Sequence, residues 1–206
     1  MLTRTAFGLA AAGFVLSLAS GALGALLILA ALVALGLGRR EHGEDHELLV
    51  MGAVPIVLLG FLVFSFPEPL ASMLVGLTAP FTSASAKAPA IAWWSLLLTG
   101  LGFLALCVGW AVALWDRAGP AGRALAVAAA VLALLLPAVL HLNAAVAGPA
   151  SGFNEGLAEG RHNFSIPWPV LTLASVAGGK IVLALALAAT ALRAYGVRRD
   201  LGAHLA

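Results

Sequence analysis

The stretch "GRREHGEDHELLV", residues 38–50, holds the densest group of side chains that could do chemistry. His42 and His46 are four residues apart, so on a helix both imidazoles would share one face. Asp45 could complete with them a site for a divalent cation that accepts nitrogen and oxygen ligands, such as nickel, cobalt or zinc. The sequence favours a structural alternative, in which a charged connection stays in water and its acids cap the next helix.

Residues 43–51 of this stretch, "GEDHELLVM", resemble a string of the hydrogenase and urease accessory permeases linked to nickel, the HupE/UreJ family. The match covers nine of 206 residues, with Met51 displaced by one position and Glu47 where an apolar residue is usual. The resemblance implies a metal-ion permease with His46 and Asp45 as candidate ligands. We do not assign the chain to this family on this string.

Lys180 is the second candidate, because it lies near the middle of the apolar run "SVAGGKIVLALAL". At the centre of a membrane span, an ammonium costs about 2.5–3.5 kcal/mol on insertion scales. No aspartate or glutamate lies within an expected spanning core. The side chain must therefore face a cavity, backbone carbonyls, a loop carboxylate, an anionic ligand or another subunit, or sit neutral.

Four other polar side chains fall in the outer halves of their expected helices, the side toward which Lys180 can snorkel. They are His141, Asn143, Thr99 and Ser175. The sequence therefore predicts an outward-facing polar pocket around Lys180 and His141. An equally supported alternative has the histidine and asparagine hydrogen-bonding across helices while the lysine fills a subunit interface.

Other chemistry has less support. A haem b needs two histidines at similar depth, and of the pair on one side, His141 and His162, the second falls in a loop. The single cysteine, Cys107, lies in an apolar run and is interpreted as a buried hydrophobe. Catalysis is not expected, because one lysine and one histidine without a nearby acid make a poor acid–base set. Haem b and a divalent metal remain minor alternatives.

Composition predicts an integral membrane protein with the lipid bilayer as its solvent. Hydrophobic residues make up 62% of the chain and charged residues 10%, and the mean hydropathy is +1.06. Soluble domains have about 45–50% apolar and 25% charged residues. No basic run exceeds two residues, so the net charge of +2 does not indicate a nucleic-acid partner.

Four segments have the roughly 20 apolar residues of a spanning helix. They are residues 47–66, 90–115, 121–147 and 168–192. Residues 6–38 would make one helix of about 50 Å, longer than a hydrocarbon core of about 30 Å. A hairpin that turns near Ser20 and Gly21 is preferred to one overlong span, and a cleaved signal peptide has the least support.

We therefore predict an all-α, polytopic transmembrane bundle over residues 1–206, with five or six membrane segments, six preferred, and no soluble domain. Two outer loops remain, residues 67–89 and 148–167. The apolar piece "LASMLVGLTAPF" in the first loop is too short to span, so we expect it in the interface or as a re-entrant segment.

The charge distribution orients this bundle. Alternating spans place seven basic residues on one face, against Lys87 and Arg161 on the other. The positive-inside rule makes the seven-residue face cytoplasmic. We therefore expect the protein in the cell's inner membrane, with the C-terminus and, if the hairpin forms, the N-terminus on the cytoplasmic side. Trp110 and Trp115 are expected in the aromatic belt at the inner surface. Glycines of the second span are expected to form a packing face; they are Gly100, Gly102 and Gly109.

Two classes of function follow. The favoured one is a non-catalytic subunit of a larger respiratory, photosynthetic or transport complex, with other membrane subunits or further copies of the chain as partners. A small-solute or metal-ion permease is the alternative, disfavoured because transporters usually have more helices or an internal repeat. A b-type cytochrome anchor is third.

Overall fold

The structure is a computed structural model that describes residues 2–38, 44–78, 84–147 and 168–204. Parts of four helices are described as backbone only; these are residues 44–46, 48–49, 84–86, 88–89, 135–147, 168–175 and 195–204. The described residues form seven helices and no strands, which confirms the all-α prediction. The helices are α1 Leu2–Leu16, α2 Gly21–Leu37, α3 Glu44–Ser65, α4 Pro67–Thr78, α5 Ala84–Leu114, α6 Pro120–Ala147 and α8 Trp168–His204.

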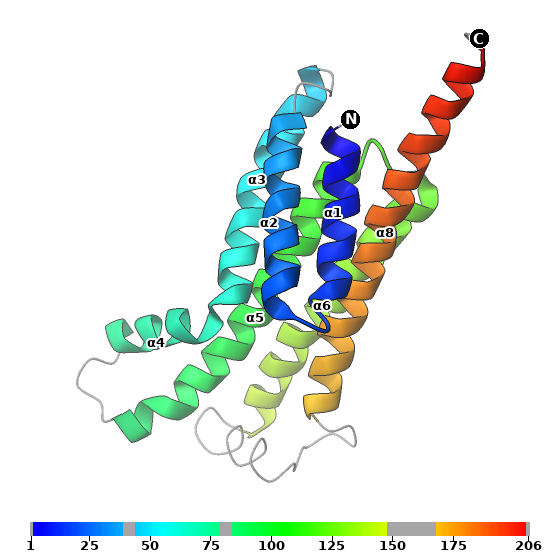
Figure 1. The fold of residues 1–206 in the computed structure, drawn as a ribbon. Coiled ribbons are helices and arrows are strands. Elements are labelled where there is room, and N and C mark those ends of the chain that lie inside the picture. Colours follow the sequence, from blue (N-terminus) through cyan, green and yellow to red (C-terminus); the bar gives the residue numbers. More distant parts are fainter. Residues whose placement is uncertain (1, 39–43, 79–83, 148–167, 205–206) are drawn as a thin grey trace.

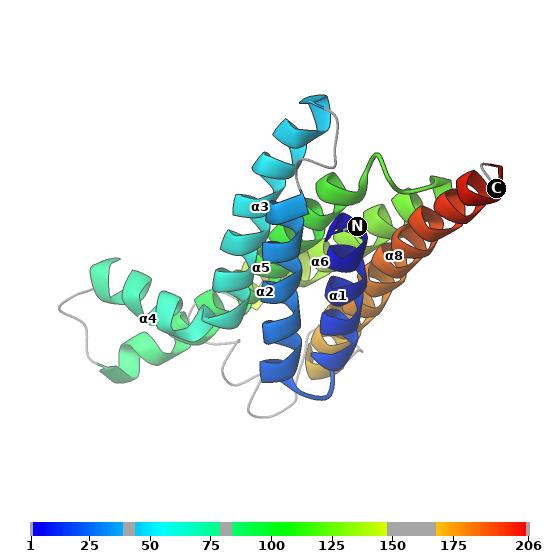
Figure 2. The same cartoon turned by 45° about the horizontal axis from the view of Figure 1, so that its top comes forward.

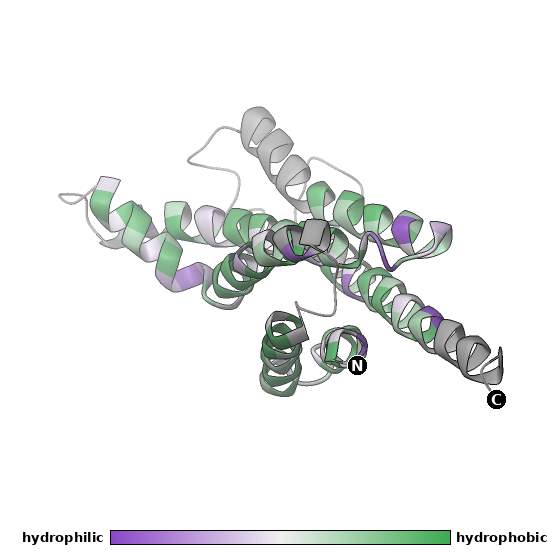
Figure 3. Ribbon diagram, turned by 90° about the horizontal axis from the view of Figure 1, so that it is seen from above, coloured by the Kyte–Doolittle hydropathy of each residue, from purple (hydrophilic) through white to green (hydrophobic). Residues whose placement is uncertain are grey.

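Two helical stretches are long and apolar enough to cross a membrane, Ala90–Leu114 in α5 and Val176–Ala194 in α8. The pair α3 and α4 passes the same test together, but its axis bends by 83° at the break between them. Seen from above in Figure 3, most of the coloured ribbon is apolar and the strongly hydrophilic residues are few. The fold is thus helical and compatible with membrane insertion.

Residues 6–38 form two helices joined by a tight turn, so the single overlong span is wrong. The chain reverses because Ser17 and Ser20 donate their backbone N–H groups to carbonyls of the last turn of α1, at 2.9 and 2.7 Å. Ser20 then caps α2, its hydroxyl accepting the N–H of Leu23 at 3.5 Å. At the other end of the hairpin, the Thr3 hydroxyl donates to the carbonyl of Gly38 at 3.3 Å.

The helices other than α4 form a ring, visible in the two side views (Figures 1 and 2). Around it α1 packs on α2, α2 on α3, α3 on α5, α5 on α6, α6 on α8, and α8 back on α1. The chain termini and the α5–α6 turn lie at the same end of this ring (Figure 1). We call it the terminal end, and the end with the α1–α2 turn the distal end.

Glycines set the closest helix crossings. At the α3–α5 crossing, a Cβ added to Gly60 would lie 2.7 Å from the backbone nitrogen of Leu106, and one added to Gly102 would lie 2.6 Å from that of Phe64. A Cβ on Gly109 would meet Val57 at 2.5 Å. The expected packing role of Gly102 and Gly109 is therefore confirmed, because no side chain fits between these backbones.

The predicted outer loop 67–89 is wrong as a loop. Residues 67–78 are α4, and α5 already begins at Ala84 and runs through Pro89. The bend of 83° between α3 and α4 turns α4 across the direction of the bundle (Figure 1). Such a bend is found in a broken span or in a re-entrant segment, and the interfacial or re-entrant position of residues 70–81 stays a prediction. Residues 79–83 and the second predicted loop, 148–167, lie outside the described residues.

The last helix is longer than predicted, because α8 continues from residue 192 to His204. The added residues include three arginines, and arginine, leucine and alanine are good helix formers. Hydropathy falls where the apolar segment ends, whereas backbone hydrogen bonds do not require apolar side chains. The predicted end at residue 192 therefore marks where the apolar segment ends, whereas the helix itself continues to His204.

Trp110 does not belong to an aromatic belt. Its side chain is fully buried and meets the ring of Phe7 edge-on, with centroids 6.4 Å apart. Trp115, in contrast, is 42% exposed at the α5–α6 turn, where the guanidinium of Arg123 stacks on its ring at 5.3 Å and Arg123 Nε donates to its carbonyl at 2.8 Å. Trp110 instead fills the ring interior near the terminal end.

The α3–α5 crossing predicts a sharp difference between two glycine substitutions. Gly102→Ala should lower the thermal midpoint of the purified protein, since its Cβ overlaps the Phe64 backbone and overpacking costs about 1–3 kcal/mol. Gly52→Ala, in α3 with no atom within 4 Å of the new Cβ, should leave it unchanged or raise it. Melting in detergent checks the pair, and equal midpoints would contradict the packing role.

Candidate functional site

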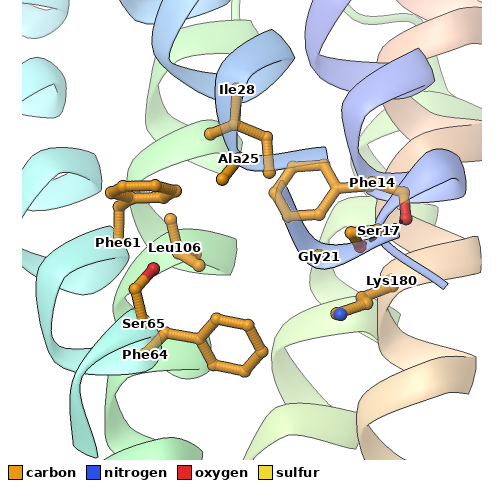
Figure 4. Close-up of a pocket in the computed structure, with 10 residues that line it drawn as sticks. All are labelled: Phe14, Ser17, Gly21, Ala25, Ile28, Phe61, Phe64, Ser65, Leu106 and Lys180. Carbon is orange, nitrogen blue, oxygen red and sulfur yellow. Dashed lines mark hydrogen bonds between the residues drawn. The ribbon is translucent and has the colours of Figure 1, made fainter. Parts of the chain in front are cut away.

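Lys180 borders a cavity of about 260 Å³ inside the distal half of the ring. The cavity lies between the α1–α2 turn, α3, α5 and α8, and Figure 4 shows Lys180 reaching into it from α8. Its described lining residues are Phe14, Ser17, Gly21, Ala25, Ile28, Phe61, Phe64, Ser65, Leu106 and Lys180. Of the surroundings that the sequence left open for this lysine, the structure shows a cavity within its own chain.

The cavity lies where α1 ends, α2 begins and α3 ends, whereas α8 continues past this level. The 15 residues of α1 and 17 of α2 reach only about 22 and 26 Å, whereas α8 is 37 residues long. Lys180 lies twelve residues after Trp168, about 18 Å along α8 from its start. The α1–α2 turn and the end of α3 reach the same level, so Lys180 lies beside three helix ends.

The ring of Phe64 is the described partner of the ammonium. Lys180 Nζ lies 5.1 Å from the centroid of this ring, a cation–π distance. Phe64 packs in turn on Phe103 of α5, with centroids 5.6 Å apart. Phe103 fits against α8 because the neighbouring residue is Gly179, where an added Cβ would lie 2.5 Å from the Phe103 ring. A Cβ on Gly178 would meet no atom within 4 Å, so only one glycine of this pair is required by packing.

Two helix dipoles also favour a cation here. Phe14 and Phe64 belong to the last turns of α1 and α3, whose C-terminal ends carry partial negative charge. Each end contributes about 0.3–1 kcal/mol, and the cation–π contact about 1–2 kcal/mol. The N-terminal end of α2 at Gly21 borders the same cavity and carries partial positive charge, so these contributions offset only part of an insertion cost of about 2.5–3.5 kcal/mol. No acidic side chain lies with Lys180 among the described lining residues.

The ammonium still has donors to satisfy. It carries three N–H donors, and within the described part of the chain it makes no hydrogen bond or ion pair. The Ser17 hydroxyl is already committed, donating to the carbonyl of Phe14 at 2.7 Å. Ser65 also borders the cavity, and its hydroxyl has no partner among the described residues. Water or an anion in the cavity could accept from both Lys180 and Ser65.

The predicted companions of Lys180 are not among the described lining residues. Thr99 is described, and its hydroxyl donates to the carbonyl of Ser95 at 2.8 Å within α5. The side chains of His141, Asn143 and Ser175 lie outside the described residues, so their place in the pocket stays a prediction.

The predicted metal site also stays a prediction. His42 lies outside the described residues, and Asp45 and His46 are described only as backbone in the first turn of α3. Among the side chains that the structure describes, no group of three histidines, cysteines or carboxylates could hold a metal ion. Cys107 is fully buried, as its interpretation as a core residue predicts.

Sequence reasoning missed Phe64, Ser17 and Ser65. The signal for the serines was present, because one precedes the predicted turn at residue 20 and the other directly precedes Phe66-Pro67, a helix end. In the prediction from sequence, the turn near Ser20 and the helix end at Pro67 lie at the outer surface, too far from Lys180 for these serines to reach it. The structure sets them about 18 Å along α8 from its start, level with Lys180.

Comparison of the chain with known protein families, curated proteins and solved structures finds no match. The similarity of residues 43–51 to nickel-linked permeases therefore rests on that string alone.

The cavity predicts that position 180 is accessible to water. A Lys180→Cys variant should react with a charged, water-soluble thiol reagent, because its side chain borders the cavity. Leu183→Cys, one turn further along α8 and fully buried, should not react, and neither should the native Cys107. Labelling followed by mass spectrometry checks this. Equal modification of both variants would contradict a water-accessible cavity at position 180.

Proposed function

We propose that this chain is an integral-membrane protein of six membrane segments that acts as a small-solute permease, with the Lys180 cavity as its solute site. The observation that carries the proposal is that Lys180 points into a cavity of its own chain, inside a ring of helices. A lysine that served chiefly to bind a partner helix would project from the outer face of the ring instead.

The arrangement of helix ends supports a solute site. Transporters commonly bind solutes where helices are interrupted, because exposed helix ends and irregular backbone can solvate a charged group. Here the cavity lies at the α1–α2 turn and beside the break between α3 and α4. On its terminal side, Phe7 and Trp110 meet and fill the ring interior. This geometry supports a solute site that is accessible from the distal end and closed on its terminal side by these two aromatic rings.

The proposed orientation places the terminal end in the cytoplasm and the protein in the inner membrane. Arg4 lies in the first turn of α1, Arg117 and Arg123 flank the α5–α6 turn, and Arg193 reaches Gly119 in that turn. These basic residues therefore gather at the end that carries both termini, as the positive-inside rule requires of a cytoplasmic face. Labelling of Lys180→Cys from outside intact cells tests the orientation.

The permease predicts that solute flux depends on Lys180. In reconstituted vesicles loaded with a panel of small anions, cations and metal ions, Lys180→Met should reduce the flux of the transported solute about tenfold or more, since a hydrogen bond to a charged group contributes about 1.5–3 kcal/mol. Lys87→Met removes the same charge from the start of α5, away from the cavity, and should leave flux unchanged. Flux that is equal in all three proteins for every solute would contradict the permease.

A second candidate is a non-catalytic subunit of a respiratory, photosynthetic or transport complex, and α4 favours it. This helix turns away from the ring (Figure 2) and leaves Met73, Leu74 and Leu77 exposed by 64, 39 and 69%. A neighbouring subunit or a second copy of the chain could cover these side chains. The bilayer interface could cover them as well. The exposed side chains of α4 therefore support a complex subunit less strongly than the Lys180 cavity supports a permease.

Purification in a mild detergent at native expression separates the two candidates. The permease should come down as one polypeptide, alone or as a homo-oligomer, whereas a complex subunit should bring stoichiometric partner chains with it. Partner chains in fixed ratio would overturn the permease as the primary function. A visible spectrum of the same sample tests for haem b, and nickel or zinc titration of a His42→Ala, His46→Ala double variant tests the metal site.

A further inference from the structure

We infer that the ligand of the Lys180 cavity is a small organic monoanion, a carboxylate attached to a short apolar or aromatic body. This inference rests on the proposed function, since it assumes that the cavity is a solute site. Charge, lining and size each restrict the ligand.

Charge makes the ligand an anion. Lys180 is the one charged side chain among the described lining residues, and no carboxylate accompanies it there. A carboxylate can accept hydrogen bonds from the ammonium and from Ser65 at once, because each of its oxygens has two lone pairs. A cation would meet the like charge of Lys180 in a pocket whose lining is largely apolar. A dianion would bring one negative charge that no described lining residue balances.

The lining makes the rest of the ligand apolar. Three phenylalanines from two helices border the cavity, together with Ala25, Ile28 and Leu106; the phenylalanines are Phe14, Phe61 and Phe64. In Figure 4 these side chains surround the space on the side opposite Lys180 and above it. Strongly hydrated inorganic anions would lose most of their water there in exchange for the few donors of Lys180 and Ser65, a cost that an apolar body does not carry. Chloride, sulfate and phosphate are therefore poor candidates.

Size makes the ligand small. The cavity of about 260 Å³ is below the range of about 300–1,000 Å³ that holds drug-sized ligands. An aryl carboxylate or a short-chain fatty acid fits this volume. A long-chain fatty acid has the same headgroup chemistry, but its chain would have to leave the cavity between helices. We therefore propose a small solute, and the experiment below tests a long-chain fatty acid, oleate, separately.

The test measures binding to the full chain, purified in detergent, by thermal shift and calorimetry. Benzoate and hexanoate should raise the thermal midpoint in a saturable way. Benzamide, which matches benzoate in shape but is neutral, should bind about tenfold or more weakly, the factor that an ionised hydrogen-bond partner adds. Lys180→Arg should keep benzoate binding, Lys180→Met should lose it, and Lys87→Met should bind as the unmodified chain does.

Three outcomes would overturn the inference. Equal binding of benzoate and benzamide would show that charge is not recognised. Stabilisation by chloride or phosphate equal to that by benzoate would show that the apolar body is not recognised. Binding of oleate without binding of benzoate or hexanoate would assign the site to a membrane lipid. The first two comparisons use the unmodified chain, so they decide the matter even where Lys180→Met does not fold.

The experiments distinguish an error in the ligand class from an error in the permease function. Lys180-dependent flux of a cation or an inorganic ion, without benzoate binding, would keep the permease and reject the organic anion. Charge-dependent benzoate binding without flux would keep the ligand class and reject transport.

Discussion

An ammonium placed in an apolar helix must be solvated by something, and no acidic side chain among the described residues does so for Lys180. This constraint connects otherwise separate features of the fold. The α1–α2 hairpin is short, α3 ends at the same level, and the Phe64 ring lies under the charge. Each brings a partial negative charge or open volume to the one place where an isolated positive charge needs it.

Small residues make this arrangement possible. The helices approach so closely at Gly60 and Gly102 that α3 and α5 share backbone contacts, and this brings Phe64 to Phe103. Gly179 then admits Phe103 against α8, which places Lys180 over the same pair of rings. The site thus depends on helix packing several residues away from the charge. In an environment without a hydrophobic driving force between helices, such close packing is the principal source of association.

The two halves of the ring of helices differ along its axis. Its interior is filled by Trp110 and Phe7 toward the terminal end and holds the Lys180 cavity toward the distal end. A bundle that served only as an anchor would gain from filling both halves, because an empty cavity forfeits packing contacts. The cavity next to a charged group is therefore better explained by a ligand than by stability, and this reasoning connects the fold to the proposed permease.

The sequence by itself determined the helical class and the apolar parts of α3, α5, α6 and α8, and it favoured the hairpin turn near Ser20 over one long span, because apolar runs and turn residues are local properties of the chain. It also identified Lys180 as an unusual residue and Gly102 as a packing residue. It could not determine the neighbours of Lys180, the buried position of Trp110 or the helical path of residues 67–78. Those depend on where helices cross and how far each one extends, which only the tertiary packing of the whole chain decides.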